Sequence, residues 1–241
     1  MSQDNYAEYY RYCPNQPKLI ISDAICRGRR RSNYPFCKGC PFNDEERARQ
    51  EGSGPATSRR QQDKARTVML EKIFKAYDIR GTYPDQLNEE LAWRIGHGTA
   101  SFLMSAIRGL ERADPNASAI VVGRDMRKSS PSLCQAFVEG SRSTGATVID
   151  IGMIDTSQIY FAINHLKTCG GVQVTASHNP AQYNGFKISG SRGVPVGGET
   201  GLNDIRRVVT NLARHDTGQQ GELKKQDLAT EYRTFVHKFL E

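Results

Sequence analysis

The chain carries the sequence Thr175–Pro180, which reads TASHNP, followed closely by Asn184–Lys187, which reads NGFK. The residues that lead into it, Val172–Thr175, form a short run between turn-forming residues, and such a run predicts a β-strand. In α/β proteins, ligands bind in the loops at the carboxyl ends of the strands. We therefore predict that this loop is the functional centre of the chain and that Ser177 is its reactive residue.

Strand and helix patterns alternate along the chain on both sides of this loop. Asn88 is a good helix N-cap, and Glu89–Glu90 would then lie in the first turn, where the helix dipole favours carboxylates. Apolar residues recur at helical spacing from Leu91 to Leu110, including Ala106, so we predict one buried helix face. A short strand and a turn are predicted within 74–81, further strands at 119–123, 147–151 and 186–188, and further helices at 130–145, 156–166, 201–213 and 231–240.

This alternation predicts an α/β fold, namely a three-layer α/β/α sandwich with a mostly parallel sheet, preceded by a small cysteine-containing module. We predict four regions: a basic module at 1–45, a linker at 46–70, the main domain at 71–215 and a C-terminal helical segment at 216–241. The net charge of +7 is uneven, because residues 1–70 hold 13 Lys or Arg and only 8 Asp or Glu. The basic character therefore belongs mainly to the N-terminal module and linker.

The sequence shows no sign of a membrane or secretory segment. It has no run of about 18 apolar residues, and its first five residues are polar, unlike a secretory signal. We therefore expect a soluble, cytoplasmic protein without membrane contact. In that compartment a disulfide framework is not the expected use of the N-terminal cysteines.

The N-terminal module carries the spacing of a metal knuckle at Cys37–Cys40, where two thiolates can bind one tetrahedral ion. Cys13 and Cys26 would complete a four-thiolate site for a structural zinc ion, with an iron–sulfur cluster or free thiols as the alternatives. The basic run Arg27–Arg31 indicates either a nucleic-acid contact or a solvated loop. The later Cys134 and Cys169 are expected to be small core residues.

Four motifs follow one another at the ends of predicted strands: Tyr77–Gly81 (YDIRG), Gly123–Arg127 (GRDMR), Thr175–Pro180 and Asn184–Lys187. In this order they closely resemble the first domain of the α-D-phosphohexomutases, the phosphomannomutase/phosphoglucomutase family. The resemblance covers about residues 71–215 and does not extend to the cysteine module.

The resemblance implies that Ser177 carries a phosphoryl group in the resting enzyme. Ser177 would donate it to a hexose phosphate, release a bisphosphate that reorients, and take a phosphoryl group back from the other end. The enzyme would thus be an intramolecular phosphotransferase that interconverts hexose 1-phosphate and hexose 6-phosphate. Phosphoryl transfer depends on positioning and charge neutralisation, and Mg²⁺ bound to the Ser177 phosphoryl group would contribute to the latter.

The resemblance also assigns roles to the residues around Ser177. His178 and Lys187 would assist proton transfer or neutralise charge, and Arg80 would fix the loop or a phosphate. Substrate binding is assigned to Tyr77, Asn179 and Arg124. Arg124 and Arg127 are also expected to have a structural role, pairing with Asp125 or with neighbouring loops. A serine hydrolase is disfavoured, because adjacent side chains diverge on an extended segment and no GxSxG elbow occurs.

The sequence departs from the family pattern in what it lacks. The family carries an aspartate-rich Mg²⁺ loop and loops for sugar and phosphate recognition in later domains, and no Asp-x-Asp-x-Asp cluster occurs here. The chain is therefore expected to be inactive without the remaining mutase domains, as a fragment or as a free-standing first domain. The alternative is a non-catalytic, mutase-like binding domain whose metal-knuckle module contacts nucleic acid or a protein partner.

Overall fold

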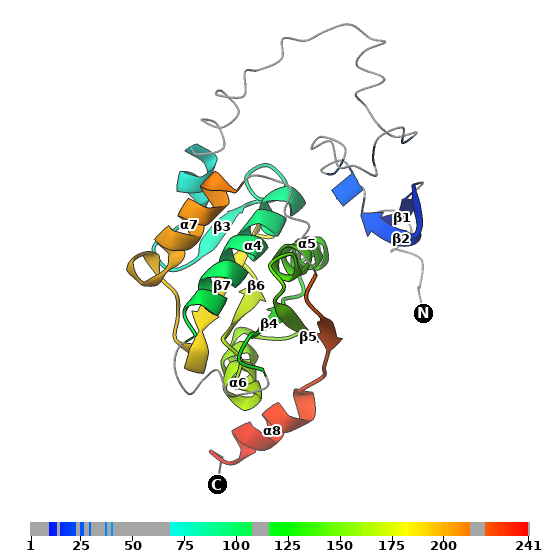
Figure 1. Ribbon diagram of the computed structural model, residues 1–241. Coiled ribbons are helices and arrows are strands. Elements are labelled where there is room, and N and C mark those ends of the chain that lie inside the picture. The colour runs from blue at the N-terminus through cyan, green and yellow to red at the C-terminus, as the bar shows by residue number, and fades with distance from the viewer. Residues whose placement is uncertain are drawn as a thin grey trace, which may run out of the picture. The chain divides into compact units, whose positions relative to one another are not determined.

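The computed structural model describes residues 10–13, 15–22, 25–26, 29, 37, 40, 68–107, 116–212 and 220–240. The chain divides into two compact units, residues 1–65 and residues 66–241. In the first unit, strands β1 (Tyr10–Cys13) and β2 (Gln16–Ser22) pair antiparallel as a hairpin (Figure 1).

The second unit is built on a six-stranded sheet in the order β3-β7-β6-β4-β5-β8 (Figure 1). Its strands are β3 (Ile79–Thr82), β4 (Ala119–Arg124), β5 (Thr147–Met153), β6 (Gly170–Val174), β7 (Tyr183–Gly190) and β8 (Leu223–Lys225). The four strands β6, β4, β5 and β8 run parallel, whereas β7 is antiparallel to both β6 and β3. The sheet is therefore mostly parallel, with an antiparallel margin next to β6.

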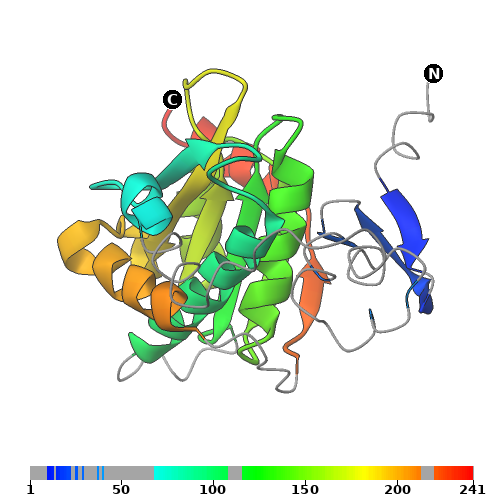
Figure 2. The same ribbon diagram turned by 90° about the horizontal axis from the view of Figure 1, so that it is seen from above.

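Helices cover both faces of this sheet. The helices of this unit include α4 (Glu89–Ser105), α5 (Ser130–Arg142), α6 (Thr156–Leu166), α7 (Leu202–Asn211) and α8 (Ala229–His237), with short 3-10 turns η3 (Ser191–Gly193) and η4 (Gly198–Thr200). The larger core lies between the sheet and α4, α5 and α7, which share one side in Figure 2. A second core lies under α6 on the opposite face. The predicted three-layer α/β/α sandwich is thus confirmed.

Local signals in the sequence account for several element boundaries. The side chain of Asn88 accepts a hydrogen bond from the Leu91 N–H at 3.0 Å, and Glu89 and Glu90 lie in the first turn of α4 as predicted. Asp155 caps α6 by accepting from the N–H groups of Ser157 and Gln158, which satisfies two donors that a helix start leaves without intrahelical partners.

Other predicted boundaries were wrong. The first helix ends at Ser105, so Ala106 is its exposed C-cap and does not extend a buried face, while Leu110 lies outside the described residues. The next helix begins at Ser130 after Ser129, one residue earlier than an N-cap at Ser130 would give. Near residue 74 the chain makes only a single bridge, and the strand proper starts after the turn, at β3.

No helix in the described ranges is long and apolar enough to cross a membrane.

Helices α4 and α5 pack closely because two glycines remove side chains from the contact. A Cβ atom at Gly140 would overlap the carbonyl oxygen of Trp93, and one at Gly96 would overlap the carbonyl oxygen of Phe137. Both obstacles are backbone atoms, which cannot rotate away as a flexible side chain can. The distance between the two helices therefore depends on these two residues.

We predict that Gly140→Ala lowers the free energy of unfolding by about 1–3 kcal/mol, because the added methyl group forces α4 and α5 apart. This effect should exceed the gain of about 1 kcal/mol that alanine brings to a helix interior. Urea denaturation followed by circular dichroism measures the change. Gly198→Ala is the control, since its Cβ would lie 3.7 Å from the nearest atom, the carbonyl oxygen of Ala76. Equal stability of Gly140→Ala and wild type would contradict the proposed helix contact.

Candidate active site

Ser177 stands on an exposed loop directly after β6, at the carboxyl end of that strand. Thr175 and Ala176 are still buried, whereas Ser177 and His178 are exposed. Ser177 has a φ angle of 55°, in the left-handed region that residues with a Cβ rarely adopt. This conformation costs about 1–2 kcal/mol, so surrounding contacts must hold it. One of them is the hydrogen bond from the Ser177 N–H to Thr175 Oγ1, at 2.8 Å.

The left-handed turn brings Ser177 and His178 together. Ser177 Oγ lies 3.3 Å from His178 Nδ1. The expectation that these adjacent side chains diverge was therefore wrong, because it assumed an extended segment and the backbone is not extended at Ser177. The imidazole can exchange a proton with the hydroxyl after only a small adjustment.

Two cationic side chains share one carboxylate on the strands beside this loop. Arg80 Nη1 lies 3.8 Å and Lys187 Nζ lies 3.9 Å from Asp78 Oδ2. The side chains of Arg80 and Lys187 are 32% and 34% exposed, so both retain access to solvent. Two positive side chains near one carboxylate leave this cluster with a net positive charge, which is suited to binding a phosphate.

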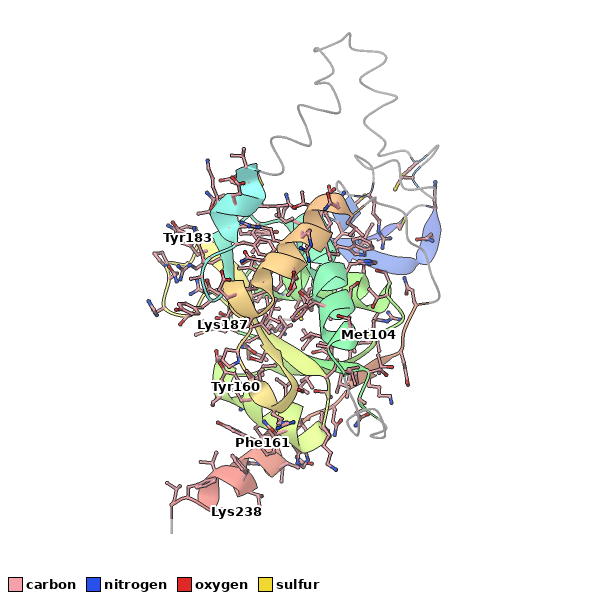
Figure 3. All side chains as sticks on the ribbon, turned by 60° about the vertical axis from the view of Figure 1, so that its left-hand side comes forward. Met104, Tyr160, Phe161, Tyr183, Lys187 and Lys238 are labelled. Carbon is pink, nitrogen blue, oxygen red and sulfur yellow. The ribbon has the colours of Figure 1, made fainter. Side chains whose placement is uncertain are left out.

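Strand register places this positive cluster (Arg80 and Lys187 with Asp78) next to the serine loop, residues 175–182. Arg80 pairs with Gly185 on β7, and the Gly185 carbonyl accepts from the Thr175 N–H at 2.9 Å. Arg80 on β3, Gly185 on β7 and Thr175, directly after β6, therefore form one row at the base of the loop. Lys187 pairs with Gln173 two residues further along β7. Figure 3 shows Lys187 on the same strand as Tyr183, where the serine loop ends.

Glycine is required in the middle of that row. A Cβ atom at Gly185 would overlap the backbone carbonyl oxygen of Ile79 on β3. The two strands can pair at this point only without a side chain there. The glycine of the NGFK motif is therefore needed for the pairing of β3 with β7.

The three predicted substrate-binding residues lie in different surroundings. Tyr77, in the bend before β3, is 82% exposed. The Asn179 side chain donates to the Ala176 carbonyl at 2.8 Å and so closes the serine loop on itself. Arg124, at the end of β4, donates to the Asp125 carbonyl at 3.5 Å. The structure thus groups Arg80, Lys187 and the serine loop, and gives Asn179 a contact inside the loop.

Asp125 is a residue whose importance the sequence analysis missed. Its carboxylate accepts from the backbone N–H of Arg127 at 3.0 Å, from Arg127 Nε at 3.1 Å and from Thr175 Oγ1 at 2.7 Å. It also accepts from the hydroxyl of Ser130. The GRDMR motif was the available signal, and it indicated only a local pairing between Asp125 and its neighbours.

The N-terminal cysteines do not support the predicted zinc site. Cys13, Cys26, Cys37 and Cys40 are all buried, and the Cys40 N–H donates to the Cys37 carbonyl at 3.1 Å. Burial, and then the charges of the other three thiolates, raises the pKa of Cys37. Nevertheless, among the residues that the structure describes, no group of three or more His, Cys, Asp or Glu side chains is arranged to hold a metal ion. Most of the basic run 27–31 lies outside the described residues.

The two later cysteines behave as core residues. Cys134 and Cys169, the latter just before β6, both lie in the larger core and are buried. Burial raises the pKa of each thiol to about 12, so both are protonated at neutral pH and are poor nucleophiles. The prediction that they are small core residues is confirmed.

Comparison with known proteins identifies the family. Residues 71–215 match the family described as phosphoglucomutase/phosphomannomutase, alpha/beta/alpha domain I. The chain is 41% identical over 161 residues to a phosphomannomutase of Klebsiella pneumoniae, which covers 66% of this chain and 95% of that protein. It is 45% identical over 149 residues to phosphohexose mutases of Xanthomonas campestris pv. campestris, covering 62% of this chain and 30% of the relative.

A solved structure supports the same assignment. The crystal structure of a phosphoglucomutase/phosphomannomutase family protein from Burkholderia thailandensis superposes with a TM-score of 0.56 and 35% identity, over 67% of this chain and 34% of that one. The chain thus spans about a third of the length of this structure and of the Xanthomonas relative. The chain belongs to the phosphoglucomutase/phosphomannomutase family and carries its first α/β/α domain.

Proposed function

We propose that this chain is the phosphoserine-bearing domain of a phosphohexomutase, with Ser177 as the residue that carries the phosphoryl group. The observation that supports this most strongly is the position of Ser177: it is exposed just beyond the carboxyl end of β6, two residues after Thr175, which shares a row with Gly185 and Arg80. A family relative named phosphomannomutase aligns over most of its own length. The substrate class that follows is a hexose phosphate.

In the proposed reaction, the bond between Ser177 Oγ and phosphorus breaks while a hydroxyl oxygen of the hexose phosphate forms a new bond to the same phosphorus. The hydroxyl loses its proton to a base, and Ser177 Oγ regains one. The hexose bisphosphate then reorients, and a second transfer returns the phosphoryl group from its other end to Ser177. His178, 3.3 Å from the hydroxyl, is placed to supply and remove the proton on the serine side.

Arg80 and Lys187 contribute charge neutralisation in this proposal. The transferred phosphoryl group carries charge on three oxygens, and nearby cations stabilise it as it moves between two oxygen atoms. Asp78 holds both cations within 4 Å, which restricts their positions and leaves a positive balance. Arg80 can bind a phosphate with two N–H groups at once, whereas Lys187 acts as a point charge.

Mg²⁺ is the cofactor that the family assignment implies. The described residues alone do not make a site for it, because they present no group of three or more carboxylate, imidazole or thiolate donors. This domain's own contribution would be the phosphoryl oxygens of Ser177, with carboxylates supplied from elsewhere in a complete mutase. We therefore propose that this chain turns over hexose phosphate very slowly without further mutase domains.

A non-catalytic, mutase-like binding domain is the alternative. Both the alternative and the mutase proposal share the fold, so only chemistry on Ser177 separates them. Lasting absence of phosphate from Ser177 would favour the binding domain, because phosphoryl transfer requires phosphate on this residue.

We predict that Ser177 takes up one phosphoryl group when the purified chain is incubated with glucose 1,6-bisphosphate and MgCl₂. Intact-mass spectrometry with peptide mapping measures the occupancy and the site. Ser177→Ala should show none, while Ser132→Ala, on α5, should match wild type. Phosphate found on another residue, or on none after prolonged incubation, would contradict the assignment.

We also predict that Lys187→Met and Arg80→Gln each slow this phosphoryl uptake by about 10²-fold, because each removes a cation that stabilises the moving phosphoryl group. Quenched-flow or hand-mixed time courses followed by mass spectrometry measure the rate. Lys224→Met is the control: Lys224 is an exposed residue of β8 that pairs with Glu222 at 3.4 Å. Wild-type rates in both test variants would remove the two cations from the mechanism.

A further inference from the structure

The guanidinium group of Arg127 uses all five of its N–H donors on groups in and beside the serine loop. The bonds are Nε to Asp125 Oδ2 at 3.1 Å, Nη1 to the carbonyls of Pro180 at 2.8 Å and Tyr183 at 3.1 Å, and Nη2 to the carbonyls of Ser177 and Asn179, both at 2.6 Å. The side chain is only 12% exposed. One cation therefore gathers four carbonyl groups of the segment 177–183.

Asp125 holds this cation in place and connects it to the rest of the domain. Its carboxylate accepts from Arg127 Nε, and it also accepts from Thr175 Oγ1 and from the hydroxyl of Ser130. Ser130 is the fully buried first residue of α5. The orientation of the Arg127 side chain is therefore fixed by a residue whose other partners lie on a buried helix start and at the end of β6.

These contacts meet at the two peptide groups that flank the Ser177 side chain. The Ser177 N–H donates to Thr175 Oγ1 at 2.8 Å, and the Ser177 carbonyl accepts from Arg127 Nη2 at 2.6 Å. Fixing both peptide groups fixes φ and ψ of Ser177, and with them the direction of its Cα–Cβ bond. The left-handed backbone at 55° thus has hydrogen bonds on both sides to maintain it.

We propose that Arg127 is the positioning residue for Ser177, and that the planar, five-donor guanidinium is required for this role. Arg127 touches no reacting atom in this proposal. It acts through the loop backbone, by holding Ser177 Oγ in one place relative to Arg80 and Lys187. A lysine keeps the charge but has three donors on a flexible stem, so it cannot replace the fork. The inference rests on the proposed function of Ser177, but its effect on the loop can be measured separately.

The test compares wild type with Arg127→Lys in the full chain. Peptide-level hydrogen exchange over residues 174–183 reports the loop, where the amides of Ser177, Asn179 and Tyr183 are hydrogen-bonded. We expect exchange at these amides to be at least tenfold faster in Arg127→Lys, with exchange in α4 unchanged. Phosphoryl uptake by Ser177 from glucose 1,6-bisphosphate should also be at least tenfold slower.

Two further variants make the test specific. Arg142→Lys is the matched control, because Arg142 Nε likewise holds a backbone carbonyl, that of Gly221 at 2.8 Å, at the other end of α5. It should leave the loop and the phosphoryl uptake at wild-type values. Thr175→Val interrupts the same path without changing Arg127, and should reproduce the faster exchange. The double variant Arg127→Lys/Thr175→Val should be no worse than the more severe single variant.

The possible results either support or contradict the positioning role of Arg127. Faster loop exchange in Arg127→Lys together with slower phosphoryl uptake supports the proposal, and Thr175→Val is read in the same way should Arg127→Lys fail to fold. Wild-type exchange in the loop, or wild-type uptake despite a loosened loop, overturns it. Absence of phosphate from wild-type Ser177 contradicts the proposed function alone, and loop exchange then decides whether Arg127 holds the loop.

Discussion

The arrangement of the candidate site depends on the carboxylate of Asp125, which joins three segments that are far apart in the sequence. Its partners lie in the loop after β4, at the start of α5 and directly after β6. Because a carboxylate has about four acceptor positions, and four donors occupy them here, its geometry is fully determined. A charged group that is largely buried is stable only with such partners. The same bonds that satisfy Asp125 therefore shape the loop that carries Ser177.

The sequence was sufficient to predict the fold class, because this depends on the alternation of strand and helix patterns. The helix at 156–166 and the N-cap at Asn88 were also correct, since both follow from local side-chain chemistry. The antiparallel direction of β7 and the pairing of β8 at the sheet edge were not predicted. Strand direction and register depend on contacts between segments distant in sequence, which a local pattern does not contain.

The site was predictable to a similar extent. Ser177, Arg80 and Lys187 were singled out from motifs. In the structure Arg80 lies on β3, Lys187 on the neighbouring β7, and Ser177 on the loop between β6 and β7. The left-handed backbone at Ser177 was not predictable, because nothing in the residue type favours it and only the tertiary hydrogen bonds hold it. The cysteines were interpreted from their spacing alone. Among the described residues no group of three or more donor side chains is arranged to hold a metal ion, so the zinc site at Cys37–Cys40 stays a prediction without support.

The connection from β6 to β7 limits how far the loop that carries Ser177 can move. Residues 175–182 link two antiparallel neighbours, so the loop is the tip of a hairpin whose stems are both hydrogen-bonded into the sheet. Because both stems are paired and four carbonyls of the segment 177–183 are bonded to Arg127, this tip is not free to move as a hinged lid does. In the proposed reaction, phosphorylated Ser177 therefore stays in place while the substrate moves. On that proposal, the hexose bisphosphate must reorient to present its two ends to Ser177 in turn.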